Sequence, residues 1–504
     1  MLTRKDFLKG SATAALAATT VTGVALADEA PAEQPDYAAQ VSETKDVDLL
    51  IIGAGLSGLA AGVQAIDDGF KVTIIDTIKT LERRGPEGLA GVGSFLQKEQ
   101  GIDLDVNEIM NRDAKFFNYR LDPLTWKDML EASGANIDWL AEKGVVFTGQ
   151  VDNYRDMGEF DTFHWFPGDH VAWQYYSTPM ADYFTGHGGE ILFETTGVDL
   201  ITDGDAVVGA YAVNAEGKVI QFNAKAVVLA TGGCGGSQEE IAKRFRTLPV
   251  GRYFCDGYFT DDGSGLNMAL KVGGVDVCIQ RCFLGGVSCV CDDGDLRAFG
   301  ATRGGSKGLN CCWVNQNGER YCNEASALEF SGAPLNAFMA QEECYSIFDA
   351  AFAGDLLDKA IAQGADPEDV NFFSGETLEE LAAAIGADPE KLAATIAQYN
   401  EYVEAGEDKM FNKPAEYLSA KFETGPFFAA RLVAVCHGMV GGLLVNRDFQ
   451  VVRWDFSPIA GLYATGTESN MNYRETYTIE VPGTDACNTV YSGRRAAQHF
   501  AANA

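Results

Sequence analysis

Basic residues are scarce in this chain of 504 residues. It has 38 lysines and arginines against 72 aspartates and glutamates, which gives a formal net charge of −34. Because a protein holds nucleic-acid phosphates with a concentrated basic face, this balance argues against a nucleic-acid partner. An acidic surface keeps such a chain in solution, and an anionic substrate would have to be drawn in by a few local arginines.

Cysteine pairs with metal-binding spacing are also lacking. The 12 cysteines form no CxxC pair and no CxxCH pattern, so the sequence encodes neither a zinc ribbon nor a c-type haem attachment, and we expect no metal ion. Seven of them lie between Cys278 and Cys322, in a spacing that matches no ferredoxin pattern. Buried thiols, disulfides formed after export and an iron–sulfur centre all stay open for this group.

A long apolar run is missing, but the N-terminus carries an export pattern. Arg4 and Lys5 precede an Ala- and Thr-rich stretch that is too short for a membrane span and closes with Ala25-Leu26-Ala27. The pattern resembles a twin-arginine signal, with an ordinary secretory signal as the alternative. We expect a signal over 1–27 that is recognised by the twin-arginine export machinery, and an acidic linker over 28–45. The protein would then work in the periplasm or elsewhere outside the cytoplasm, either free or held at the membrane by a partner.

A dinucleotide-binding fingerprint follows the first apolar run. Residues 48–52 predict a buried parallel strand, which leads into Gly53-Ala54-Gly55-Leu56-Ser57-Gly58 and an Ala-rich helix. Gly53 permits the tight turn, Gly55 lets a pyrophosphate approach the backbone, and Gly58 lets helix and strand pack closely. Leu56 and Ser57 then begin a helix whose N-terminus faces the phosphates.

Three further strand ends indicate a large dinucleotide. A strand over 72–75 ends at Asp76, where an acid accepts hydrogen bonds from ribose hydroxyls. Another apolar run ends in Thr231-Gly232-Gly233, and a third, Gly-Leu-Tyr-Ala-Thr-Gly, ends at Gly466. Because such ends converge at one edge of an open α/β sheet, they suit one extended ligand, and FAD fits better than NAD.

Together with Asp262-Gly263-Ser264-Gly265 and Gly441-Gly442-Leu443-Leu444-Val445, these motifs resemble the FAD-dependent fumarate reductase/succinate dehydrogenase flavoprotein family. This is the FAD-binding 2 type, which includes urocanate reductase and 3-ketosteroid dehydrogenase relatives. The resemblance implies an α/β fold, with a Rossmann-like FAD-binding domain and an inserted α+β capping domain. The FAD-binding domain would comprise 46–276 and 438–504, and the cap 277–437.

The resemblance also implies how the flavin is held and what flanks it. Asp262 would contact the cofactor, and the last helix would point its N-terminus at the flavin, with Thr484, Asp485 and Asn488 beside it. Within the cap, residues 378–382 and 392–396 predict two short amphipathic helices, joined by a turn that carries a capped helix start at Asp388-Pro389.

Reduction of an activated alkene needs a hydride, a group that polarises the substrate and an acid. The cap segment ending in Asn323-Glu324 resembles the one that carries the family's proton-donating arginine, but that position is Leu328, and a family histidine is replaced by Cys282. Fumarate or succinate chemistry itself is therefore less favoured than reduction of another substrate. The candidate cleft residues are Arg303, Arg474, Tyr473, Tyr477 and His437.

The sequence thus predicts a flavin reductase for a small α,β-unsaturated acid or enone, supplied with electrons by a separate cytochrome, flavoprotein or quinone pathway. Flavin-dependent desaturation of a 3-ketosteroid-like compound is one alternative, and a non-catalytic electron relay is another. The aromatic residues of 163–176 would stack on a flat substrate or pack in the core.

Overall fold

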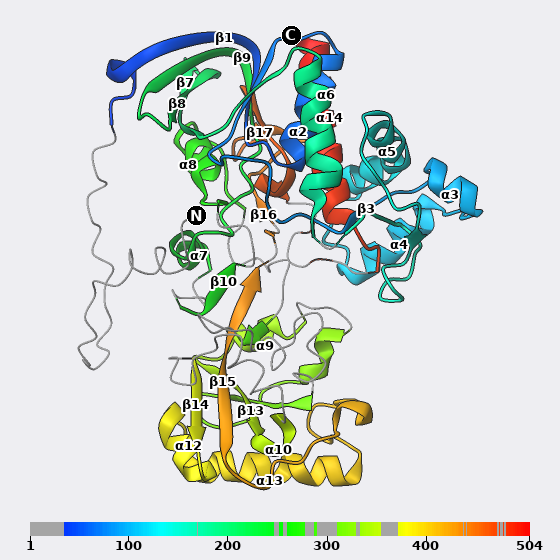
Figure 1. The fold of residues 1–504 in the computed structure, drawn as a ribbon, viewed down its shortest axis with the longest axis vertical. Coiled ribbons are helices and arrows are strands. Elements are labelled where there is room, and N and C mark those ends of the chain that lie inside the picture. Colours follow the sequence, from blue (N-terminus) through cyan, green and yellow to red (C-terminus); the bar gives the residue numbers. More distant parts are fainter. Residues whose placement is uncertain are drawn as a thin grey trace.

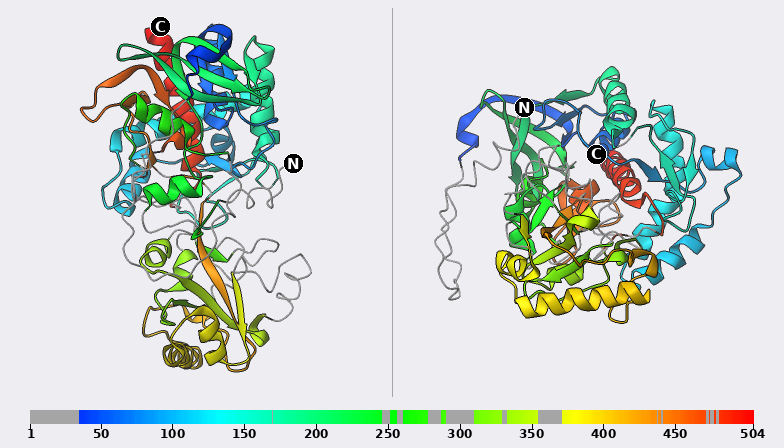
Figure 2. Two further views of the ribbon diagram at one scale, coloured as in Figure 1. Left: turned by 90° about the vertical axis from the view of Figure 1, so that its left-hand side faces the viewer. Right: turned by 60° about the horizontal axis from the view of Figure 1, so that its bottom comes forward.

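The computed structural model describes residues 35–168, 170–245, 251–255, 260–277, 287–289, 310–328, 333–353, 371–436, 438–439, 441–470, 473, 477 and 480–504. Two groups of elements lie at opposite ends of the molecule (Figures 1 and 2). One contains the large sheet with its helices, and the other is built around the long strand β15 (Phe427–Cys436).

The large sheet is parallel at its centre. Its order is β17-β18-β9-β1-β2-β6, and the hairpin β7–β8 extends it from β9. The strands β18, β9, β1, β2 and β6 run parallel to one another, whereas β17 is antiparallel to β18. The bounds are β1 (Val41–Ile52), β2 (Val72–Ile75), β6 (Glu190–Leu192), β7 (Thr195–Asp203), β8 (Ala206–Asn214), β9 (Val219–Leu229), β17 (Gln450–Val452) and β18 (Pro458–Ala464).

Helices pack on this sheet through small residues. In α2 (Leu56–Asp67), a Cβ on Gly62 would lie 2.8 Å from Ile74 of β2 and 3.1 Å from Phe184 of α6 (Thr178–Gly186). A Cβ on Gly493 of α14 (Thr484–Asn503) would lie 2.3 Å from the Ser57 carbonyl oxygen. The three helices lie side by side in Figure 1, so the buried central strands are covered as the near-continuous apolar runs predict.

The expected linker boundary needs a correction. β1 begins at Val41 rather than near Asp46, and its early residues pair with β9 from Val41↔Val219 onward. These residues are exposed or half-buried and lack apolar periodicity, which is why the sequence pattern gives no sign of a strand. Backbone pairing with the neighbouring strand extends β1 into the acidic segment.

A helical region with a small sheet flanks α14. It comprises α3, α4 and α5, and the sheet has the order β3-β5-β4. Their bounds are β3 (Gly88–Ala90), α3 (Phe95–Gln100), α4 (Val106–Phe116), α5 (Pro123–Glu142), β4 (Val151–Asp152) and β5 (Phe163–Trp165). The indole Nε1 of Trp126 in α5 donates to Asp113 of α4 at 2.8 Å and ties the two helices together.

A second sheet has β15 as its centre. β13, β14 and β11 pair antiparallel to β15, and β12 extends the sheet beyond β13. β10 (Tyr253–Cys255) also joins β15, in parallel, although its residues fall within the segment 46–276 expected for the FAD-binding domain. The other bounds are β11 (Val287–Cys289), β12 (Cys312–Asn315), α9 (Leu335–Met339), β13 (Cys344–Asp349), α10 (Ala350–Ala353) and β14 (Phe372–Gly375).

The two predicted cap helices are confirmed as α12 (Leu378–Ile385) and α13 (Pro389–Ala405). Asp388 caps α13 by accepting from the amides of Glu390 and Lys391, and Gly386 ends α12 in the left-handed conformation. The remaining α-helices and strands in the described ranges are α7 (Gln238–Arg244), α8 (Ser264–Lys271), β16 (Gly441–Gly442) and β19 (Ser469–Asn470). Over the described ranges, none of the helices is long and apolar enough to cross a membrane.

Candidate cofactor site

The predicted strand ends meet at the carboxyl edge of the large sheet. The amide of Gly53 donates to the Ile75 carbonyl at 2.8 Å, and the amide of Ala230 donates to the Ile52 carbonyl at 2.8 Å. The amide of Thr465 donates to the Leu229 carbonyl at 2.9 Å. These bonds align the ends of β2, β1, β9 and β18, so segments far apart in sequence present their loops at one edge, where open α/β sheets bind ligands.

The three fingerprint glycines differ in what surrounds them. Gly53 has φ +113° and a Cβ there would lie 2.2 Å from the Ala230 carbonyl oxygen, while a Cβ on Gly58 would lie 1.9 Å from the Gly53 carbonyl oxygen. A Cβ on Gly55 would meet no described atom within 4 Å. Two of the glycines therefore allow close backbone packing, and Gly55 leaves open space at the start of α2, where Leu56 and Ser57 follow.

Asp76 lies at this edge and is held in place by the backbone. Its Oδ2 accepts from the Ala54 amide at 2.6 Å and from Arg83 at 2.8 Å, and its Oδ1 accepts from the Ile78 amide at 3.1 Å. The carboxylate is buried, while Arg83 is partly exposed. An acid fixed between the fingerprint turn and the following loop is suited to accept ribose hydroxyls.

The end of β9 contacts two buried acids that the sequence analysis did not select. Thr231 donates its hydroxyl to Glu468, and the amide of Gly233 donates to the same Glu468 oxygen at 2.9 Å. A Cβ on Gly232, which has φ +90°, would lie 2.5 Å from the carboxylate of Asp261. Thr231, Gly232 and Gly233 thus form a tight turn whose outer side is lined with carboxyl groups.

Gly466 and the last helix complete the edge. Gly466 has φ +65°, and a Cβ on it would lie 2.7 Å from Ser57 Oγ. Its amide donates to the Ser492 hydroxyl at 2.9 Å. Gly483, at φ +87°, precedes α14 without a side-chain cap. The positive end of the dipole of this 20-residue helix therefore suits a negatively charged or electron-rich group.

The predicted residues of α14 and Asp262 differ in their surroundings. Thr484 and Asn488 are fully buried in the first turns of α14, and Asp485 lies in the same turn. Asp262 is exposed, and its Oδ1 accepts from the Ser264 amide at 2.9 Å, which stabilises the turn before α8. The buried acid at this turn is Asp261 rather than its neighbour.

The loop after Asp76, whose contacts the sequence leaves unassigned, reaches the start of α14. Its strand β3 donates the Ala90 amide to the Gly483 carbonyl at 2.9 Å, and a Cβ on Gly483 would lie 2.6 Å from the Ala90 nitrogen. The adjoining Glu87 accepts from the Tyr154 hydroxyl and, at 3.1 Å, from Arg155. This loop therefore anchors the N-terminus of the last helix.

These residues fit an FAD molecule. The space beside Gly55 at the start of α2 suits a pyrophosphate, and the N-terminus of α14 suits an electron-rich ring. Within the described part of the chain, Glu468 Oε1 and the Thr465 hydroxyl are buried at the same edge without a hydrogen-bond partner. Buried polar atoms of this kind are normally satisfied, so they are matched by a hydroxyl-rich ligand.

Two of the predicted catalytic residues lie next to α14. Tyr473 is fully buried, and its ring packs edge-on to Trp126 with centroids 5.3 Å apart and lies 5.1 Å from the ring of Tyr477. Burial raises the pKa of Tyr473 well above its usual value, with Tyr477 and Asp485 adding to this and the Thr484 hydroxyl opposing it. The tyrosine that the sequence treats as a loop residue is therefore anchored in the core and stays protonated. Arg303, Arg474 and His437 lie outside the described residues, as does Cys282.

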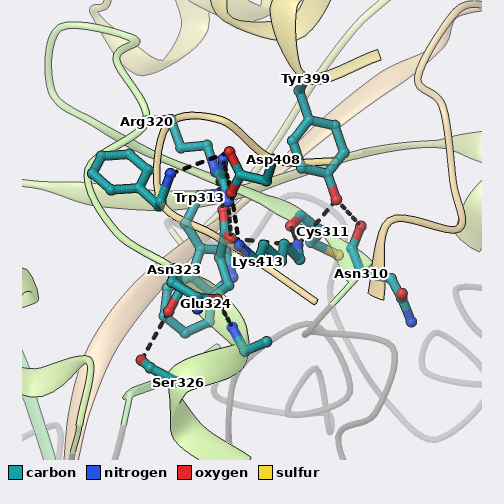
Figure 3. Close-up of polar contacts among 12 residues, drawn as sticks. Asn310, Cys311, Trp313, Arg320, Asn323, Glu324, Ser326, Tyr399, Asp408 and Lys413 are labelled. Carbon is teal, nitrogen blue, oxygen red and sulfur yellow. Dashed lines mark hydrogen bonds and ion pairs between the residues drawn. The ribbon is translucent and has the colours of Figure 1, made fainter. Parts of the chain in front are cut away.

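Glu324, in the cap segment that resembles the family's acid-bearing one, belongs to a buried ion-pair network (Figure 3). Its carboxylate accepts hydrogen bonds from Arg320 Nε at 2.9 Å and from Arg320 Nη2 at 2.8 Å, and it lies 3.3 Å from Lys413 Nζ. Arg320 also contacts Asp408 at 2.8 Å, and Lys413 donates to the Tyr399 hydroxyl at 3.0 Å. Because every member is paired inside the cap, the network is structural, and Leu328 is not replaced here by another proton donor.

The cysteine group and the aromatic stretch are also structural where they are described. Cys289, Cys311, Cys312 and Cys322 are all buried, and no cluster of metal-binding side chains occurs in the portion of the chain that the structure covers. The aromatic stretch 163–176 mostly packs: Trp165 stacks on Tyr154 at 5.2 Å, and His164 contacts Ser94 Oγ at 2.7 Å. A shallow cap cavity of about 470 Å³ lies beside Arg320 and Tyr399, on the network rather than at the carboxyl edge.

Three residues of the site were missed by sequence reasoning. Arg83 pairs with Asp76, Asp261 directly precedes the motif residue Asp262, and Glu468 follows Gly466 by two residues. Their positions beside the motifs were visible. The burial of Asp261 and Glu468 depends on the meeting of the ends of β9 and β18, and the partner of Arg83 depends on how the loop after β2 folds back, neither of which the spacing alone gives.

Comparison with known proteins gives consistent matches. The family model described as "FAD binding domain" matches residues 48–479. The chain is 29% identical to the vinyl phenol reductase of Lactiplantibacillus plantarum, over 90% of this chain and 96% of the relative. It is 28% identical to the NADH:fumarate oxidoreductase of Klebsiella pneumoniae, over 84% of this chain but only 44% of that relative. The open conformation of a flavocytochrome c3 fumarate reductase superposes with a TM-score of 0.70 at 23% identity, covering 92% of this chain and 79% of that one.

Proposed function

Because the chain belongs to the FAD binding domain family and is an FAD-dependent oxidoreductase with the predicted α/β fold, we propose that it reduces an activated carbon–carbon double bond in a small α,β-unsaturated acid or enone. The observation that carries this proposal is the near full-length similarity to a vinyl phenol reductase. These two relatives are named for reactions of vinyl phenol and of fumarate, and both compounds contain a carbon–carbon double bond, so alkene reduction is the chemistry that supports the proposal.

The proposed cofactor contacts are those gathered at the carboxyl edge. Gly53, Gly55, Gly58 and the start of α2 would hold the pyrophosphate, and Asp76 the adenosine ribose. The turn at the end of β9 and the N-terminus of α14 would hold the rest. When bound, FAD supplies the hydride for the alkene. We propose 46–276 and 438–504 as the cofactor-binding segments and 277–437 as the cap. β1 extends the first segment back to Val41, and β10 pairs with β15 of the cap sheet.

Tyr473 is the described residue best suited to polarise the substrate. Its hydroxyl lies in the core beside the first turn of α14, and the rings of Trp126 and Phe117 fix its position. A phenol with a strongly raised pKa is neutral at physiological pH and acts as a hydrogen-bond donor. We propose that Tyr473 donates to the substrate's electron-withdrawing group while Arg474, its neighbour in sequence, binds a carboxylate.

The electron source and the location are part of the same proposal. The sequence has no haem-attachment motif, so a separate cytochrome, flavoprotein or quinone pathway would reduce the flavin, as a respiratory chain does. The N-terminal signal pattern supports action outside the cytoplasm after twin-arginine export.

The proposal is tested by purifying the mature chain anaerobically and screening unsaturated acids, enones and vinyl phenols for oxidation of a reduced viologen. We expect turnover with at least one compound. Tyr473→Phe should lower kcat with little change in bound FAD, and Tyr345→Phe, which alters a buried tyrosine of β13 outside the site, is the matched control. Viologen oxidation by dyes alone, with no alkene turned over, would instead identify an electron relay.

A second candidate is desaturation of a 3-ketosteroid-like substrate. It is favoured by the two adjacent buried tyrosines, Tyr473 and Tyr477, since a phenol can assist removal of a proton beside a carbonyl. A saturated cyclic ketone that bleaches the oxidised flavin in stopped-flow, where alkenes fail to reoxidise the reduced flavin, would select this candidate.

A further inference from the structure

Glu468 has an asymmetric set of contacts at the end of β18. Its Oε2 atom accepts two hydrogen bonds, from the Thr231 hydroxyl and from the Gly233 amide at 2.9 Å. Its Oε1 atom is buried and has no hydrogen-bond partner among the described residues. A Cβ on Gly265 would lie 2.9 Å from Oε1, so this oxygen lies close to the start of α8 at the carboxyl edge. The side chain itself is fully buried.

The charged groups around Glu468 are mostly acids. Burial is the main cause that raises the pKa of Glu468, and Asp262 and Asp276, which lie before and after α8, raise it further. Asp276 accepts from Arg244 of α7 at 2.6 Å, and Arg244 is also paired with Glu240, so this cation is already engaged.

Asp261 is the acid closest in character to Glu468. It is buried beside Gly232, and burial raises its pKa well above the usual value. The charges of Glu468 and Asp76 raise this pKa further, and the charge of Arg83 lowers it. Arg83 is paired with Asp76 at 2.8 Å. The cations described near this edge thus neutralise other carboxylates, and none forms an ion pair with Glu468 in the part of the chain that the structure describes.

We propose that Glu468 is a proton-holding acid of the cofactor site, whose protonated Oε1 donates a hydrogen bond to an oxygen of bound FAD while Oε2 accepts from Thr231 and Gly233. A protonated carboxyl group has one acceptor oxygen and one O–H donor. This matches Oε2, which accepts two hydrogen bonds, and the buried Oε1, which has no partner among the described residues. An ionised carboxylate would add a buried negative charge beside Asp261, Asp262 and a dinucleotide that carries two phosphate charges.

This arrangement links cofactor binding to proton uptake. Burial raises the pKa of Glu468 to about 7 in the protein without ligand, with the bonds from Thr231 and Gly233 acting in the opposite direction. If an oxygen of FAD accepts a hydrogen bond from the protonated Oε1, the pKa of Glu468 in the complex is higher still. FAD affinity should then be constant below about pH 7 and fall about tenfold per pH unit above it, because one proton is taken up with each FAD.

The test uses the full mature chain, stripped of flavin and reloaded. FAD affinity is measured by quenching of flavin fluorescence from pH 6 to pH 9, and proton uptake by a pH-indicator dye in weak buffer. We expect the slope and the proton uptake in the wild type and in the control Asp199→Asn, whose carboxylate pairs with Lys271 outside the site. We expect neither in Glu468→Gln, whose amide still supplies a donor and an acceptor. Asp261→Asn tests whether the neighbouring acid holds the proton instead. At pH 6 the affinity of Glu468→Gln should lie within about threefold of the wild type.

Three results would overturn the proposal. They are a pH slope that persists in Glu468→Gln, a slope that disappears only in Asp261→Asn, and loss of FAD at pH 6 in a Glu468→Gln protein with a native circular dichroism spectrum. If flavin cannot be removed reversibly, the infrared spectrum of the holoenzyme decides: a protonated carboxyl C=O band must be present in the wild type and absent in Glu468→Gln. These readouts need no substrate, so they stand apart from the alkene-reduction proposal.

Discussion

Replacing Gly55 by alanine should separate cofactor binding from folding. Gly55 precedes α2 with φ −76° and ψ −173°, a conformation that any residue adopts, and a Cβ there would meet no described atom within 4 Å. The folded protein without FAD should therefore tolerate the methyl group. It should gain about 0.4–1 kcal/mol of stability, because alanine restricts the unfolded chain more than glycine does.

The loss should appear only when the phosphates approach. The added methyl group occupies the space through which a pyrophosphate reaches the first amides of α2. Hydrogen bonds to a charged group contribute about 1.5–3 kcal/mol each, so displacing one or two of them predicts a fall in FAD affinity on the order of 100-fold.

Isothermal titration of the stripped protein with FAD measures the affinity, and thermal unfolding without FAD measures the stability. Gly186→Ala is the matched control, since Gly186 ends α6, has a negative φ and also has open space around its Cβ position. It should leave FAD affinity unchanged. Wild-type affinity in Gly55→Ala, or an unfolding temperature well below that of Gly186→Ala, would refute the assignment of this space to the phosphates.

Three further outcomes are expected. Glu324→Ala should destabilise the cap by about 3–5 kcal/mol in denaturant unfolding, because it leaves Arg320 and Lys413 buried without their shared partner, and an effect below 1 kcal/mol would contradict the network's role. Burial lowers the pKa of His164 to about 4. As the pH falls from about 6.5 towards 4, the histidine takes up a proton in the unfolded chain but not in the folded one, so the free energy of unfolding should drop by up to about 3 kcal/mol. Chemical denaturation at several pH values should show this slope in the wild type and not in His164→Gln. Burial raises the pKa of the Cys312 thiol to about 12, so iodoacetamide at pH 8 should alkylate it only after unfolding, as peptide mass spectrometry would show, and rapid labelling of the native protein would contradict its burial.

Local patterns gave the parts of this site that depend on short stretches of chain. The fingerprint turn, the strand ending at Asp76 and the two cap helices were predictable, because a buried parallel strand, a glycine turn and a capped helix each leave a mark within a few residues. The family resemblance supplied the order of the motifs and FAD itself.

Contacts between distant segments could not be predicted in this way. Glu468 meets Thr231 across 237 positions, and Lys413 meets Glu324 inside the cap, so neither pairing has a local signal. Tyr473 was predicted only as a cleft residue, and nothing near it in sequence indicates that its ring packs on Trp126 far upstream. Val41 begins a strand for the same reason, since the partner that extends β1 lies in β9.

The pairing of β18 with β9 also sets when the protein can acquire its prosthetic group. β18 begins at Pro458, so a ribosome must deliver nearly the whole polypeptide before Thr231 and Gly233 can meet Glu468. A nascent chain therefore carries an unfinished nucleotide platform through most of its synthesis, with long loops still to close. Flavin loading belongs to the period after release from the ribosome, and early stop codons anywhere upstream of β18 should yield colourless protein.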